Sequence, residues 1–211
     1  MSGTASKMFN TWRKGYGPIV HREETVERIV ALASSGRIDP QPLYRMLVAA
    51  DRLTSAAMWS VVHMTYTKRV DLSGAPLSAD AFKTTPEGHT GGSLNMVPAF
   101  VGYLTANAIS ATTRSWLMGQ GHCVAAIEAV NVLTGDVSPA QKGRYDRSEK
   151  GLSQLAADFY SYKIGPDGAP AVPLGSHAGP NTAGAISEGG YLGFAEVQYV
   201  HMPLPGESLV A

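Results

Sequence analysis

The stretch Asp39–Thr67 reads DPQPLYRMLVAADRLTSAAMWSVVHMTYT and has the pattern of a long helix. Asp39 is a favourable N-cap residue. Pro40 and Pro42 suit the first helical turn, where a backbone N–H has no intrahelical acceptor to reach. The sequence therefore predicts one long helix that begins at residue 40.

Upstream, EETVERIVALASSG at 23–36 places apolar side chains one helical turn apart, from Val26 to Ala33, and ends at Gly36. This spacing predicts an amphipathic helix. Residues 1–22 mix Gly, Lys, Arg and aromatic residues without a period, and we expect a loosely attached arm. The arm and this first helix make up residues 1–39.

Downstream, residues 70–88 have turn chemistry and predict a loop, with one short helix after Ser78. SLNMVPAFVGYLTANAIS at 93–110 predicts a helix that tolerates Pro98 only if it begins close to that residue. RSWLM, GQGHC and VAAIEAVNVL then follow in order over 114–133. A strand, a glycine turn and a helix in this order predict a βα unit of a parallel sheet.

Further helices are expected at 148–163 and 188–202, with a Pro/Gly-rich loop between them, and SLVA at the C-terminus predicts the start of a strand.

The composition excludes several classes of protein. The formal net charge is zero, with 17 basic and 17 acidic residues, which argues against a nucleic-acid partner. No run of 18 apolar residues predicts a membrane span, and no secretory signal is visible. A single cysteine, Cys123, excludes an internal disulfide and fits a reducing compartment, so we expect a cytoplasmic protein.

Three histidines lie among glycines: His89 in EGHTGG, His122 in GQGHC and His177 in GSHAG. Glycine lets the backbone approach a ligand closely, and imidazole can donate, accept or titrate near neutral pH. Converging on one pocket, they would suit a phosphorylated polyol. Each can equally be a turn or cap residue. A zinc site lacks a close pair of ligands, and a P-loop lacks its lysine.

These segments resemble a known family. GHTGG, WLMGQGH and GSHAGPNTAGAISEGGYLG resemble, in order and spacing, the N-terminal module of phosphoketolases and, more distantly, of transketolases. YRMLVAADRLTSAAMW and PLSADAFKTTPEGH extend the resemblance upstream, over about residues 40–211, and on that basis we expect 40–211 to be a separate module. The resemblance implies a doubly wound, mostly parallel α/β sheet flanked by helices, incomplete at the C-terminus, that binds thiamine diphosphate through Mg²⁺.

The resemblance also implies an activity and its residues. Phosphoketolases are aldehyde-lyases that cleave xylulose 5-phosphate or fructose 6-phosphate with phosphate, giving acetyl phosphate and an aldose phosphate. The residues carried over by motif are catalytic His89, His122 and His177, with Gly88, Gly121, Gly189 and Gly190 near the cofactor. The family active site forms between two subunits, which implies a homodimer for the full-length enzyme.

The sequence also departs from the family pattern. The second motif reads GQGHC where the family has a GPGHG-like sequence, and EGGYLG stands where EGGELG is usual. A transketolase-like or epimerase-type sugar-phosphate enzyme of the same fold therefore stays open. The Mg²⁺ ligands are expected beyond Ala211, so we expect the isolated chain to be inactive. It is then one part of a larger or split enzyme, or a non-catalytic interaction fragment.

Overall fold

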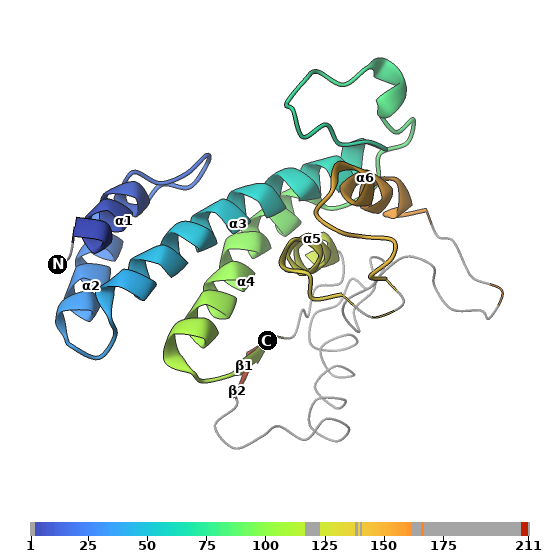
Figure 1. Cartoon of the computed structure of the whole chain (residues 1–211). Coiled ribbons are helices and arrows are strands. Elements are labelled where there is room, and N and C mark those ends of the chain that lie inside the picture. Colours follow the sequence, from blue (N-terminus) through green and yellow to red (C-terminus); the bar gives the residue numbers. More distant parts are fainter. Residues whose placement is uncertain are drawn as a thin grey trace.

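A computed structural model describes residues 3–116, 123–137, 139, 141–161, 166 and 208–210. The helices are α1 (Gly3–Arg13), α2 (Glu23–Ser34), α3 (Pro40–Tyr66), α4 (Thr90–Ser110), α5 (Val124–Thr134) and α6 (Glu149–Asp158), with a 3₁₀ turn η1 (Ala79–Ala81). Two strands, β1 (Arg114–Trp116) and β2 (Ser208–Val210), complete the elements of the described residues. The described part of the chain is therefore predominantly helical (Figure 1).

Helix α3 is the longest described helix and contacts each of the other α-helices described. Its 27 residues span about 40 Å at the usual helical rise. As predicted, it begins at Pro40, and the Asp39 carboxylate accepts a hydrogen bond from the backbone N–H of Gln41 at 2.9 Å. Helices α1 and α2 pack at its N-terminal end, α4 runs back along it, and α5 and α6 lie toward its other end (Figure 1). The long helix thus joins two clusters of packed helices.

The expectation of a loosely attached arm at 1–22 is wrong. Residues 3–13 form α1, which buries Ala5 and Trp12. The following segment is held by His21, whose Nε2 lies 2.8 Å from the Asp51 carboxylate on α3 and whose ring lies 4.5 Å from that of Trp12. These contacts join residues far apart in the sequence, so local periodicity does not reveal them. The division at residue 39 stays a prediction.

Helix α5 lies at the centre of the larger cluster. Every residue from Val124 to Val130 is buried, and so is Val132. Helix α3 contributes Val61 and Met64 to the same core, and α4, α6 and Phe159 complete it. Since a helix on the surface of a domain keeps one polar face, burial all round places α5 in the interior of this cluster.

The prediction of a doubly wound, mostly parallel sheet is wrong. Among the described residues, strands occur only as β1 and β2, three residues each, paired in parallel with Arg114 opposite Ser208 and Trp116 opposite Val210. The short strand predicted at 114–118 and the strand start predicted at the C-terminus are both present. The helices, however, bury their apolar faces against one another rather than against a sheet. The helix predicted at 188–202 lies outside the described residues.

Most of the predicted helices are confirmed: α2, α3, α5 and α6, together with η1 in the 70–88 loop. Helix α4 begins at Thr90, earlier than predicted, so Pro98 lies well inside it. The expectation that the helix begins close to Pro98 is therefore wrong. Asn107 closes the C-terminal end of α4, since its side chain accepts from the Arg114 N–H at 2.9 Å and donates to the Arg114 carbonyl at 3.0 Å.

A buried carboxylate holds segment 141–147 against α6. Asp158 is fully buried and accepts hydrogen bonds from Arg144 Nε at 2.7 Å, Tyr145 Oη at 2.8 Å and Gln154 Nε2 at 2.9 Å. A buried charge is tolerated when hydrogen bonds satisfy it, and removing the charge leaves its donors without an acceptor.

We expect Asp158→Asn to lower the free energy of unfolding by about 2–3 kcal/mol, because the donors of three side chains lose an anionic acceptor. Urea unfolding monitored by circular dichroism measures the loss. The control is Glu23→Gln, which breaks the exposed Arg13–Glu23 ion pair at 3.3 Å and should cost less than about 0.5 kcal/mol. Equal losses in the two variants would contradict the role assigned to Asp158.

Candidate functional site

The predicted site residues fall into two groups. Gly88 and His89 belong to the described structure, at the start of α4. The other five lie outside the described residues: His122, His177, Gly121, Gly189 and Gly190. The site is therefore built from the first glycine-histidine motif and the side chains around it.

Gly88 lies just before α4, close to the C-terminal ends of α3 and α6. Its φ is +134°, a backbone conformation that residues with a Cβ rarely adopt. A Cβ here would lie 3.1 Å from Thr65 Oγ1 near the end of α3 and 3.6 Å from Cε1 of Phe159, which follows α6. The sequence needs glycine here because the backbone passes close to both side chains.

His89 is the N-cap residue of α4 and is exposed. Its carbonyl accepts from the Ser93 N–H at 3.0 Å, while its side chain makes no capping hydrogen bond. The first turn of α4 contains Thr90 and two glycines and no acidic residue. The N-terminus of a 21-residue helix carries partial positive charge and N–H groups that favour anionic or hydroxylated ligands.

Ser93 lies inside the first turn of α4 and is fully buried, and its hydroxyl has no hydrogen-bond partner among the described residues. The cap position belongs to His89. Thr90 steadies this turn, because its hydroxyl donates to Thr65 Oγ1 at 3.1 Å.

Lys83 joins the ends of α3 and α6 beside Gly88. Its Nζ donates to the carbonyl of Met64 at 2.6 Å and to that of Phe159 at 2.9 Å. Burial lowers the pKa of this ammonium from 10.5 to about 8, against the opposing effects of the Glu87 and Asp158 carboxylates. The lysine supplies positive charge where two helices end, which is the favourable sign at helix C-termini.

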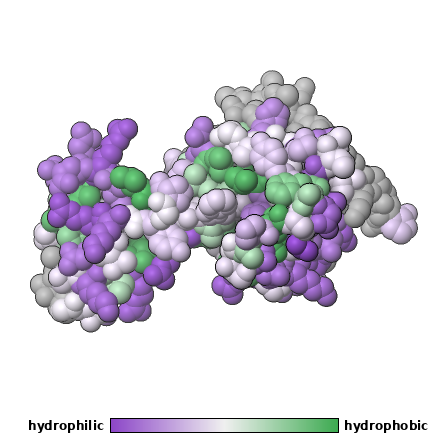
Figure 2. Space-filling view, turned by 90° about the horizontal axis from the view of Figure 1, so that it is seen from above, coloured by the Kyte–Doolittle hydropathy of each residue, from purple (hydrophilic) through white to green (hydrophobic). Residues whose placement is uncertain are grey.

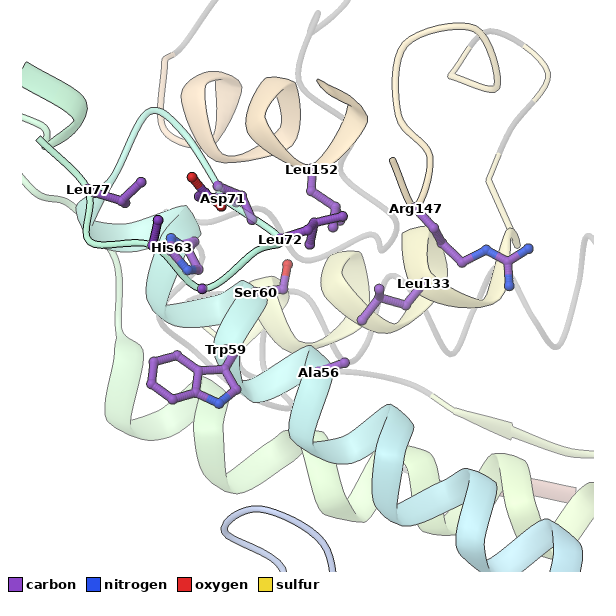
Figure 3. A pocket seen from close by; sticks show the side chains of 13 residues that line it. Ala56, Trp59, Ser60, His63, Asp71, Leu72, Leu77, Leu133, Arg147 and Leu152 are labelled. Atoms are coloured by element: carbon purple, nitrogen blue, oxygen red, sulfur yellow. The ribbon is translucent and has the colours of Figure 1, made fainter. Parts of the chain in front are cut away.

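Two hollows adjoin this region. One, of about 220 Å³, is lined by Lys83, Glu87 and the residues that follow α6. The other, of about 590 Å³, lies between α3, the 70–77 loop and α6, where Trp59, His63 and Leu152 line it (Figure 3). Figure 3 shows Arg147 extending its guanidinium away from His63. This larger hollow includes neither motif residue of the described structure.

The surface around the larger hollow is partly apolar. Viewed from above, the part of the molecule formed by α1 and α2 is largely hydrophilic, whereas hydrophobic side chains gather over the other part (Figure 2). Trp59 is 62% exposed and Leu72 is 58% exposed, and both line the larger hollow.

Two buried polar groups lie on α5. Cys123 is its N-cap residue and is buried, and burial raises the pKa of its thiol. Glu128 is only 2% exposed within a helix that is otherwise apolar on its buried positions. Sequence reasoning missed Glu128, although a lone acidic residue in VAAIEAVNVL is itself a signal for a buried polar role.

The described residues can contact an anionic or hydroxylated molecule, but among them no cluster of metal ligands occurs. Gly88 and the N-terminus of α4 offer close backbone approach and N–H groups, which suit an anionic, hydroxylated molecule. No group of three His, Cys, Asp or Glu side chains able to hold a metal ion occurs among the described residues. No helix in that part of the chain is long and apolar enough to span a membrane.

Comparison with known proteins identifies the family. A family model described as the XFP N-terminal domain, the N-terminal domain of phosphoketolases, matches residues 44–201. The chain belongs to this family. The match includes all three glycine-histidine motifs and supports the phosphoketolase-like reading of this chain as an N-terminal part. Phosphoketolases are a lyase-type family that generally depends on thiamine diphosphate, and membership implies sugar-phosphate substrates.

No curated protein and no solved structure gave a significant match to the chain.

A first prediction tests the fit of the backbone at Gly88. Gly88→Ala should lower the free energy of unfolding by about 1–3 kcal/mol, because a Cβ is strained at positive φ and meets Thr65. Thermal and urea unfolding measure the change. Gly91→Ala is the matched control, since nothing lies within 4 Å of its added Cβ, and it should be neutral or stabilising by up to ~1 kcal/mol. A neutral Gly88→Ala would contradict the close approach.

A second prediction concerns the pH dependence that Lys83 confers. Its folded pKa of about 8 is below the ordinary 10.5, so between these values the unfolded chain keeps a proton that the folded chain has lost. Stability therefore rises with pH in this window. We expect wild type to gain stability relative to Lys83→Met from pH 8 to pH 10.5, the two pKa values cited.

Urea unfolding of both proteins at several pH values across this window gives the difference. The exposed Lys142→Met variant controls for the loss of one positive charge. A difference that stays constant or falls with rising pH would contradict the buried state of the Lys83 ammonium.

Proposed function

We propose that the chain forms part of the donor-sugar site of a phosphoketolase. The complete enzyme cleaves xylulose 5-phosphate or fructose 6-phosphate with inorganic phosphate, giving acetyl phosphate and an aldose phosphate. The observation that supports this is the family match over residues 44–201, which spans all three glycine-histidine motifs. The exposed position of His89 at the N-terminus of α4 is compatible with a substrate contact.

In this proposal, the histidines contact the substrate and the glycines allow the backbone to approach it. The imidazoles of His89, His122 and His177 bind hydroxyl groups of the donor sugar and exchange protons with them, which suits side chains that titrate near neutral pH. Gly88, Gly121, Gly189 and Gly190 let the backbone lie close to the cofactor and substrate. A Cβ at Gly88 would be strained at positive φ and would crowd Thr65 Oγ1, so this glycine allows the close approach that places His89 at the start of α4.

Thiamine diphosphate, when bound, supplies the stabilisation of negative charge on carbon that cleavage of the sugar needs. The described residues contribute to the substrate side of such a site, and Mg²⁺ takes its ligands from other parts of the enzyme. By resemblance to the family, we also propose that the complete enzyme is a homodimer with its active site between subunits.

The proposal is tested in the complete enzyme with His89→Ala and His122→Ala. Each should lower kcat/KM for acetyl phosphate formation by about a hundredfold, because a positioned acid–base group is lost. Conversion of acetyl phosphate to its hydroxamate provides the assay. The melting temperature of each variant, measured alongside, separates a loss of activity from a loss of stability.

His63→Gln is the matched control, because His63 lines the other hollow, and it should retain activity within about twofold of wild type. Activity of His89→Ala or His122→Ala within a few-fold of wild type would exclude their donor-site role. Epimerisation of the sugar phosphate without acetyl phosphate would show that the proposed reaction is wrong.

A further inference from the structure

The smaller hollow beside Gly88 is polar in a way that the family motifs do not explain. It has a volume of about 220 Å³ and lies between the segment that precedes α4 and the residues that follow α6. Two ammonium groups, three hydroxyls and one carboxylate line it: Lys68, Lys83, Thr84, Thr85, Ser161 and Glu87. The rings of Phe159 and Tyr160 supply the apolar part of the wall.

Tyr160 brings Ser161 to this hollow. Its φ is +61°, so the chain turns sharply after α6, and the Ser161 N–H donates back to the Asp158 carbonyl at 2.8 Å. The Ser161 hydroxyl oxygen is thereby buried, yet it has no hydrogen-bond partner among the described residues. A buried hydroxyl without a partner is costly, and its presence in a folded protein calls for a ligand or a water molecule.

The Lys83 ammonium likewise lacks a partner that neutralises its charge among the described residues. Its ammonium donates to two neutral carbonyls, and no carboxylate of the described residues forms an ion pair with it. An ammonium has three N–H donors, so one remains for a further acceptor. A water molecule would accept that hydrogen bond but would not neutralise the charge, whereas an anion would do both.

We propose that this hollow binds a small oxyanion of the phosphate class, as inorganic phosphate or as the phosphoryl end of a phosphate monoester. Lys83 and Lys68 provide its positive charge, and Ser161 and the two threonines provide hydroxyl donors. Phosphate has enough acceptor oxygens to satisfy the third Lys83 N–H and the Ser161 hydroxyl together. Glu87 lines the same hollow and opposes the anion, so the affinity is moderated. The site depends on these contacts alone and holds whether or not the proposed function is correct.

Isothermal titration calorimetry of the full chain tests the site with two probes, inorganic phosphate and glycerol 3-phosphate, at constant ionic strength and pH 7. We expect saturable binding of at least one probe. Tighter binding of glycerol 3-phosphate would identify a monoester site, and tighter binding of phosphate an inorganic phosphate site. Either result supports the proposal.

Variants then locate the binding. Ser161→Ala and Lys68→Gln should each weaken it by about tenfold, since each removes one donor to a charged acceptor. Glu87→Gln should tighten it several-fold, because a repelling charge is removed. Ser161→Ala removes a hydroxyl that has no partner among the described residues, so the variant should fold normally. Lys7→Gln, at an exposed position of α1, removes the same charge as Lys68→Gln at a distant place and should bind as wild type does.

Four results would overturn the proposal. Three of them are the absence of saturable binding of both probes in the millimolar range, affinity unaltered by both Ser161→Ala and Lys68→Gln, and equal weakening by Lys7→Gln. The first would show that the hollow holds water only. The other two would show that the anion binds elsewhere or through general surface charge. Unaltered affinity in Glu87→Gln would likewise exclude this hollow.

Discussion

The burial of α5 on all sides is the constraint on which the larger cluster depends. Its residues from Val124 to Val130 are shielded from water. Helices α3 and α4 pack directly against α5, and α6 contributes side chains to the same core. Apolar burial is the dominant favourable term in folding, and a helix of small and β-branched residues allows neighbouring helices to approach closely. The positions of α3 and α4 follow from covering this helix.

That arrangement brings three helix ends together. The C-terminal ends of α3 and α6 meet at the Lys83 ammonium, and the N-terminal end of α4 begins beside them at His89. Carbonyl-rich ends attract a cation, and an N–H-rich end attracts anions. The packing of the core therefore places the negative carbonyl ends of α3 and α6 around the positive Lys83 ammonium, with the positive N–H end of α4 beside them. Gly88 is the point where the backbone passes between these ends, and a Cβ there would be strained at positive φ and close to Thr65.

The elements that depend on nearby residues could be predicted from the sequence. The Asp39 cap with Pro40, and the apolar period from Val26 to Ala33, are signals contained within the helices they describe. The expected arm failed for the opposite reason. Its first residues are helical because Trp12 packs with His21, which in turn pairs with Asp51 on a distant helix. A contact between residues 30 positions apart leaves no periodic pattern.

The sheet was predicted wrongly because the same local pattern allows two folds. RSWLM followed by glycines and VAAIEAVNVL is equally consistent with a helix that covers a sheet and with one enclosed by other helices. Among the described residues, the contacts of α5 with α3 and α4 distinguish the two folds. Resemblance to a family identifies residues through short motifs such as Gly88–His89 and carries a fold along with them. The motif requires only that a glycine and a histidine begin a helix beside other packed elements. In this structure those elements are the ends of α3 and α6, and the ends of strands could serve equally well.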